Sequence, residues 1–205
     1  MRPLLLDMDG VLADFDRPLF WAYGPWLNCT PETQVHRFLT EHLVGDIGGG
    51  STRSELRARM RADVEAPGWF RELPLIKGAQ EAVEILESRY WDVWLCSKPL
   101  EASTTCASEK FAWVAEHFPS LVGKLILAPN KGMVSGSVLV DDAIKPSWLT
   151  YANWAPVVYD HPWNRTGKYS LSGWTGPQGR INWTNYIHNP SFNLFSRSHN
   201  ATSNR

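Results

Sequence analysis

Short, uninterrupted runs of apolar residues recur along the chain, with longer mixed segments between them. The runs occupy residues 4–6, 93–96, 125–127, 138–140 and 157–159 and are rich in Leu, Val and Ile. Strands that are buried on both faces of a parallel sheet show this continuous pattern, whereas half-exposed strands alternate apolar and polar positions. Each run therefore predicts a buried strand of a parallel sheet.

Helical periodicity appears in two of the intervening segments. Residues 78–90 and 107–118 carry apolar side chains at helical spacing, at Ala82, Val83, Ile85 and Leu86 in the first and at Phe111, Val114, Ala115 and Phe118 in the second. Strands that alternate with helices form βαβ units, whose crossovers cover the sheet. The predicted fold class is therefore α/β, with a parallel sheet and helices on both of its faces.

The segment between the first predicted strand and residue 78 is much longer than an ordinary strand-to-helix connection. It contains helical patterns at residues 32–44 and 51–64, with glycines at 45 and 48–50 between them. We predict that residues 17–74 form a small helical cap, and that residues 1–16 and 75–188 form the α/β core. A stripe on the second cap helix, Arg53, Arg57 and Arg61, is interpreted as a solvent-exposed face. Residues 189–205 are rich in Asn and Ser, and this composition predicts a disordered tail.

Composition narrows the class of protein. The chain of 205 residues is 43% hydrophobic and 20% charged, which is typical of a globular protein that needs one core. A formal net charge of −1 argues against a nucleic-acid polymer as partner. The three cysteines, Cys29, Cys96 and Cys106, do not show the spacing of a disulfide framework or a metal site. The N-terminus lacks the apolar length of a secretion signal, and no apolar run is long enough to cross a membrane. We therefore predict a cytoplasmic protein without membrane partners.

Polar residues that could together bind a metal ion and a phosphate follow four of the predicted strands. In chain order they are Asp7, Asp9, Ser97, Lys98, Lys131, Asp141 and Asp142. Ligands of open parallel sheets bind at the carboxyl ends of the strands, where these side chains would meet. Four carboxylates would repel one another without a cation, but they are compatible with a magnesium ion beside a phosphate that the hydroxyl and ammonium groups bind. The sequence thus predicts a site for Mg²⁺ and a phosphate.

These residues resemble the motifs of the haloacid dehalogenase (HAD) superfamily of phosphatases. Asp7 lies in a stretch similar to its first motif, Ser97 resembles the second, Lys131 the third and the pair at 141–142 the fourth. Within the superfamily, the chain is similar to 5′(3′)-deoxyribonucleotidases in DMDGVLADF (7–15), CSKP (96–99), EKFAWV (109–114), KGMVSGSVLVDD (131–142) and YDHPWN (159–164). The resemblance spans residues 3–187 and implies a HAD-like, Rossmannoid core with an inserted cap. Two positions depart from the family pattern: Lys98 replaces a small hydroxyl residue, and Glu101 replaces a basic one.

The resemblance also implies roles for the motif residues. Asp7 is the candidate nucleophile, and Asp9 the candidate acid and base. Magnesium would be bound by a carboxylate oxygen of Asp7, the backbone carbonyl of Asp9 and the carboxylate of Asp142, with Asp141 as support. Phosphoryl oxygens would be bound by Ser97 and Lys131, with Lys98 as a further candidate. Candidate contacts to the base or the sugar are Phe15, Phe38, Trp69 and Phe70.

The predicted function is that of a magnesium-dependent 5′-nucleotidase, which converts (deoxy)ribonucleoside monophosphates to nucleoside and phosphate through an aspartyl-phosphate. The alternative is a HAD phosphatase for another small phosphomonoester, such as a sugar phosphate. A phospho-acceptor receiver domain is disfavoured by the Asp7–Asp9 spacing and by the large insertion, and an inactive nucleotide-binding module is disfavoured by the intact set of acids. The sequence leaves open the preferred base, the sugar and phosphate-position selectivity, and the oligomeric state, a homodimer included.

Overall fold

The protein is built on one six-stranded parallel sheet. The computed structural model describes residues 2–27, 30, 35, 53–89, 91–164 and 170–175. The strand order is β3-β2-β1-β4-β5-β6. The strands are β1 (Arg2–Leu6), β2 (Trp91–Ser97), β3 (Leu125–Leu127), β4 (Val138–Asp141), β5 (Ala155–Tyr159) and β6 (Ser170–Leu171). All five predicted strands are confirmed; β6, with two residues, is too short to show a sequence pattern.

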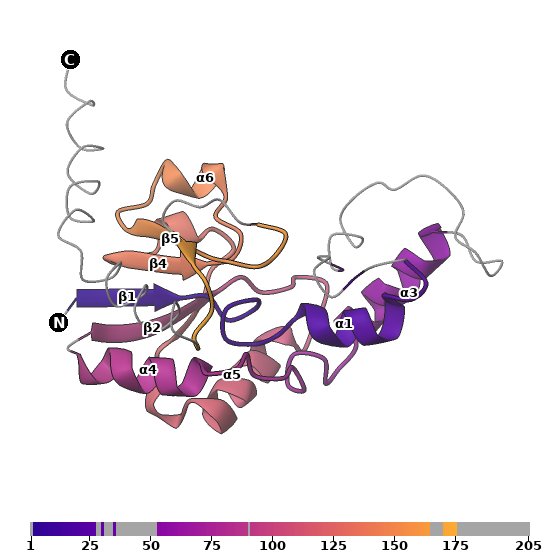
Figure 1. The fold of residues 1–205 in the computed structure, drawn as a ribbon, viewed down its shortest axis with the longest axis horizontal. Coiled ribbons are helices and arrows are strands. Elements are labelled where there is room, and N and C mark those ends of the chain that lie inside the picture. The colour runs from indigo at the N-terminus through magenta and orange to yellow at the C-terminus, as the bar shows by residue number, and fades with distance from the viewer. Residues whose placement is uncertain are drawn as a thin grey trace, which may run out of the picture.

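The two faces of the sheet pack against different elements, as the continuous apolar runs predict. On β1, Leu4 and Leu6 belong to the core shared with α4 (Ala79–Ser88) and α5 (Cys106–His117), whereas Leu5 packs with Trp148 and Trp154 on the other face. Trp148 lies in the short helix α6 (Pro146–Leu149). Figure 1 shows α4 and α5 on one side of the sheet and α6 on the other. The predicted α/β class with helices on both faces is confirmed.

The predicted apolar face of α5 is wrong in part. Phe111 is 48% exposed and Ala115 is also exposed, while the buried face consists of Cys106, Glu109, Lys110, Trp113 and Val114. Two charged residues therefore lie inside the protein, which is costly unless each finds partners. Both do, as the site below shows, and these tertiary partners decide which face of the helix is buried.

The long insertion leaves and re-enters the core at neighbouring points. Ala13 forms an antiparallel bridge with Leu75, and the Asp14 amide donates to the Pro74 carbonyl at 2.7 Å. Between these points lie α1 (Asp16–Tyr23), which the pattern did not predict, and α3 (Arg53–Glu65), which matches the second predicted cap helix. Figure 1 shows both beyond the carboxyl end of β1. This arrangement agrees with the predicted cap, although its boundaries stay a prediction.

Other parts of the sequence-based prediction concern residues outside the described ranges. They are the cap helix at 32–44 except residue 35, the segment 176–188 and the tail at 189–205. Among the helices that the structure describes, none combines the length and the apolar character that a membrane span requires. Cys96 and Cys106 are both buried free thiols.

Candidate active site

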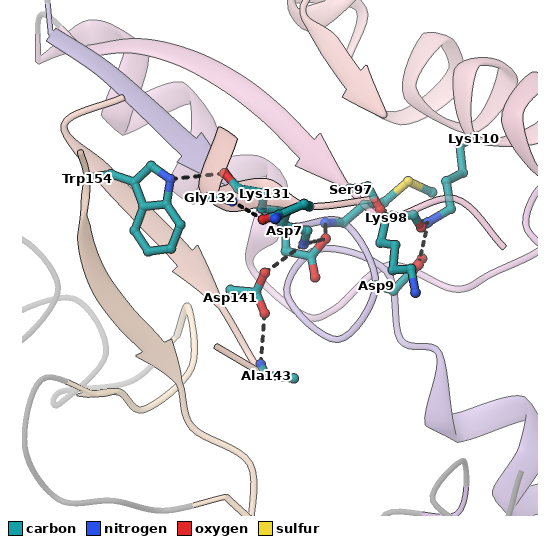
Figure 2. A network of polar contacts seen from close by, with 12 residues as sticks. Asp7, Asp9, Ser97, Lys98, Lys110, Lys131, Gly132, Asp141, Ala143 and Trp154 are labelled. Carbon is teal, nitrogen blue, oxygen red and sulfur yellow. Dashed lines mark hydrogen bonds and ion pairs between the residues drawn. The ribbon is translucent and has the colours of Figure 1, made fainter. Parts of the chain in front are cut away.

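The order of the strands brings the motif residues to one edge of the sheet. β1 lies between β2 and β4, so their carboxyl ends adjoin. Asp7 directly follows β1, Ser97 ends β2 and Asp141 ends β4. Lys131 begins the 3₁₀ helix η2 (Lys131–Met133), which precedes β4. Figure 2 shows these side chains converging at this edge.

Lys131 links the first and fourth motifs. Its buried ammonium lies 2.6 Å from Asp7 Oδ1 and 2.6 Å from Asp141 Oδ2. Burial alone would lower the pKa of this lysine, but the two carboxylates outweigh burial and raise it. The other oxygen of Asp141 accepts a hydrogen bond from the Ala143 amide at 2.8 Å. Asp141 is thus held through both oxygens, in a position that supports its neighbours.

Asp7, Asp141 and Asp142 form an acidic cluster. Each offers a carboxylate oxygen, and these atoms lie within 4.8 Å of one another. Burial and the charges of Asp7 and Asp141 raise the pKa of Asp142 well above its ordinary value. Within the described part of the chain, no hydrogen-bond donor reaches the Asp142 carboxylate. An all-oxygen donor set with excess negative charge fits a hard divalent cation such as Mg²⁺.

Gly10 lets the first motif loop lie against this cluster. Its φ is +76°, and a Cβ at this position would lie 2.7 Å from Asp142 Oδ2. A side chain is therefore disfavoured both by backbone strain and by the carboxylate. The imidazole Nε2 of His161 lies 2.6 Å from the Gly10 carbonyl oxygen, and Asn164 Nδ2 donates to the Asp142 carbonyl at 2.8 Å. The segment 161–164 thus contacts both motif loops, a connection that the sequence pattern did not suggest.

Asp9 lies on the other side of the site from the cluster. One of its carboxylate oxygens, Oδ2, forms an ion pair with Lys110. The other, Oδ1, is buried and has no hydrogen-bond partner within the described structure. Burial raises the pKa of the Asp9 carboxyl, while the charge of Lys110 opposes the increase. A buried oxygen without a hydrogen bond costs free energy in the folded protein.

Lys110 is the site residue that sequence reasoning missed. It belongs to EKFAWV, which was matched to the family without a role for the lysine, and helical periodicity assigned it no buried position. The side chain is fully buried, and Nζ donates to Ser97 Oγ at 2.7 Å and to the Lys98 carbonyl at 3.2 Å. Figure 2 shows Lys110 reaching Asp9 and Ser97 from α5.

Two cavities open beside these residues. A cavity of about 180 Å³ is lined by Asp7, Asp9, Gly10, Phe15, Asp16, Asp142 and Ala143. A larger one of about 510 Å³ is lined by Asp9, Phe15, Arg61, Val64, Glu65, Phe70, Lys98, Pro99, Leu100 and Ala102. Asp9 and Phe15 line both, so the small acidic cavity and the large, more apolar one adjoin at these two residues.

The predicted substrate contacts have different outcomes. Phe15 and Phe70 line the large cavity, with ring centroids 6.2 Å apart. Trp69 packs edge-on against Phe15 at 6.0 Å and lines neither cavity, so its position favours a supporting role. Phe38 lies outside the described residues. Arg61, which we interpreted as part of a solvent-exposed stripe, is exposed but also lines the large cavity.

Comparisons with known proteins show to which family the chain is related. The family model described as 5′ nucleotidase, deoxy (pyrimidine), cytosolic type C protein (NT5C) matches residues 2–181. The human 5′(3′)-deoxyribonucleotidase of cytosolic type is 35% identical over 144 residues, 68% of this chain and 69% of that protein. A Bordetella pertussis protein named for the same activity is 35% identical over 166 residues, 79% of this chain and 85% of that protein.

The fold also has solved counterparts. The magnesium-bound form of the Bacillus subtilis protein YfnB, described as a HAD-hydrolase, superposes with a TM-score of 0.50. The match covers 92% of this chain and 98% of YfnB at 14% identity, and so bears on the fold alone. The family model and the relatives together show that this chain belongs to the 5′(3′)-deoxyribonucleotidase family, a group of phosphoric monoester hydrolases, and its fold is like that of a HAD-hydrolase.

Proposed function

We propose that the protein is a magnesium-dependent 5′-nucleotidase, which hydrolyses (deoxy)ribonucleoside monophosphates through an aspartyl-phosphate on Asp7. The observation that carries the proposal is the position of Asp7: it contacts the Lys131 ammonium, offers a carboxylate oxygen within 4.8 Å of one from Asp142, and lines a cavity together with Asp9. A nucleophile, an acid and a place for a cation thus border one small space.

Asp7 has one oxygen available for the reaction. The Met8 amide and Lys131 both contact Oδ1, at 2.7 Å and 2.6 Å. We infer that Oδ2 attacks the phosphorus, which forms a new P–O bond and breaks the bond to the nucleoside oxygen. Asp9, which lines the same cavity, would donate a proton to that leaving oxygen.

The second step regenerates the enzyme. Asp9, now ionised, would take a proton from a water molecule, whose oxygen attacks the phosphorus and displaces the Asp7 carboxylate. A magnesium ion held by Asp7, the Asp9 carbonyl and Asp142 would supply positive charge for the phosphoryl oxygens. Ser97 and Lys131 would bind other phosphoryl oxygens, and the exposed Lys98 could approach from the large cavity.

The nucleoside would occupy the cavity of about 510 Å³, which lies within the usual size range of small-molecule pockets. Phe15 and Phe70 would offer ring surfaces for the base or the sugar. These aromatic walls, together with the family, favour a nucleotide over a sugar phosphate. No nucleic-acid polymer or membrane is required as a partner, and a cytoplasmic location stays a prediction.

A substrate panel tests the proposal. Purified protein is assayed for phosphate release from deoxyribo- and ribonucleoside monophosphates and from sugar phosphates, with Mg²⁺ and after exhaustive chelation. We expect the highest kcat/KM for a nucleoside monophosphate, loss of activity on chelation, and recovery when Mg²⁺ is restored. Asp7→Asn should abolish turnover in a folded protein.

The same panel distinguishes the alternative substrate class, the sugar phosphates, from nucleotides. A sugar phosphate that exceeds every nucleotide in kcat/KM would contradict the substrate assignment but leave the chemistry intact. Full activity after chelation, or turnover by Asp7→Asn at the wild-type rate, would instead contradict the chemistry.

A further inference from the structure

Lys110 is buried at the centre of the site, and its donors are already used. The ammonium contacts Asp9 Oδ2, donates to Ser97 Oγ and to the Lys98 carbonyl, and lies 5.0 Å from the centroid of the Phe70 ring. A lysine ammonium has three N–H donors, and three oxygens of the protein accept them here. Lys110 therefore has no spare donor for a phosphate, which distinguishes it from a substrate ligand.

The ion pair determines how the Asp9 carboxylate is oriented. Since Lys110 contacts Oδ2, the unpartnered oxygen is Oδ1. Rotation of the carboxylate would require the buried ammonium to lose its ionic partner, which is strongly unfavourable. The same ammonium also holds the Ser97 hydroxyl, so one side chain sets the orientation of groups from two different motifs.

The surroundings of Lys110 hold it firmly. The preceding residue on α5, Glu109, accepts hydrogen bonds from the amides of Gly68 at 2.6 Å and Phe70 at 3.0 Å. Trp113, one turn further along, donates from Nε1 to the Leu73 carbonyl at 2.8 Å. These contacts fix the segment that carries Phe70 against α5, and so fix the aromatic ring beside the Lys110 ammonium.

We propose that Lys110 is a positioning residue, which orients the Asp9 carboxyl group for proton exchange with the leaving nucleoside oxygen. The inference rests on the proposed role of Asp9. Lys110 keeps its own protons throughout, and its effect on proton transfer passes through Asp9. Loss of such a supporting contact typically lowers activity by about 10- to 100-fold.

The test uses single-turnover bursts with two leaving groups. A nucleoside leaving oxygen needs protonation, whereas p-nitrophenolate needs little. Lys110→Met should lower the nucleotide burst rate by about 10- to 100-fold, lower the p-nitrophenyl phosphate burst rate much less, and leave KM nearly unchanged. Lys110→Gln serves as a second variant if the methionine variant does not fold. Lys77→Met, at an exposed lysine outside the site, is the matched control and should behave as the wild type.

A double-mutant cycle separates this inference from the proposed function. Asp9→Asn alone should slow the nucleotide burst by about 10²–10⁴-fold, and adding Lys110→Met should slow it no further, because both changes remove one function. Multiplicative losses, equal losses for both substrates, or a raised KM for both would overturn the role of Lys110 while the role of Asp9 stands. An Asp9→Asn variant with a normal nucleotide burst would overturn both.

Discussion

The Asp142 carboxylate is ionised at a cost to the folded protein when no cation is bound. Because its pKa is raised by burial and by Asp7 and Asp141, the folded protein favours the protonated form more than the unfolded chain does. The penalty is absent below the unfolded pKa, grows as the pH rises towards the folded pKa, and is complete above it. This change of stability with pH is opposite in sign to that of a salt-bridged aspartate, whose ionised form stabilises the folded protein.

Asp142→Asn should therefore raise the melting temperature of the metal-free protein at neutral pH, with a smaller gain in acid. The same change should abolish stabilisation by Mg²⁺, which for the wild type amounts to about 2.7 kcal/mol at 100 times the dissociation constant. Thermal melts with and without Mg²⁺ measure both effects. A variant that melts lower without metal, or that responds to Mg²⁺ as the wild type does, would refute the role given to Asp142.

At the scale of single residues, sequence reasoning identified the groups that follow strands and missed the one on a helix. The convergence of Asp7, Ser97 and Asp141 could be predicted because the ends of parallel strands meet at one edge. Lys110 could not, because a lysine beside a glutamate on a helix ordinarily lies at the surface. The position of Lys110 in the site follows only from the packing of α5 against the first motif loop.

At the scale of elements, Glu109 joins α5 to the segment that returns from the insertion. Burial opposes its ionisation, but the hydrogen bonds from Gly68, Thr105 and Phe70 outweigh burial and lower its pKa. Its ionised form thus stabilises the folded state above the unfolded pKa, and this contribution is lost as the pH falls through the folded pKa.

Glu109→Gln should destabilise the protein at neutral pH by about 1–3 kcal/mol, because its amide group cannot replace both acceptors. The difference from the wild type should shrink in acid. Denaturant unfolding at several pH values measures it, with Glu116→Gln, at an exposed position on the same helix, as the matched control. Equal stabilities of the two variants at neutral pH would show that this contact does not hold the segment.

The success of prediction also varied among elements. The strands of the sheet were found because burial on both faces leaves an uninterrupted apolar run, as in β4, where all four residues are buried. Helix α1 was missed because only Leu19 and Tyr23 of its eight residues are buried, which leaves too little periodicity. On α5 the apolar pattern was wrong in part, because Glu109 accepts hydrogen bonds from backbone amides and Lys110 pairs with Asp9, so that both are buried.

At the scale of the whole molecule, the large cavity is formed jointly by the insertion and the core. Arg61, Val64 and Glu65 of α3 line one wall, and Lys98 to Leu100 line another. α3 is joined to α1 by the hydrogen bond from Tyr23 to Asp63. The acidic residues therefore lie at the strand ends of the core, whereas the large cavity takes four of its ten lining residues, Arg61, Val64, Glu65 and Phe70, from the insertion, where the sequence pattern carried least information.

The central claim is that Asp7 accepts the phosphoryl group of a nucleotide, and trapping the intermediate tests it most directly. The Asp9→Asn variant is suited to this, since it should form the aspartyl-phosphate slowly but hydrolyse it even less readily. It is mixed with Mg²⁺ and a nucleoside monophosphate, quenched in acid and reduced with borohydride, and the modified residue is located by peptide mass spectrometry. We predict modification at Asp7 that requires both Mg²⁺ and nucleotide. Nucleoside release with no modification of Asp7, or with the phosphoryl group on another residue, would contradict the account.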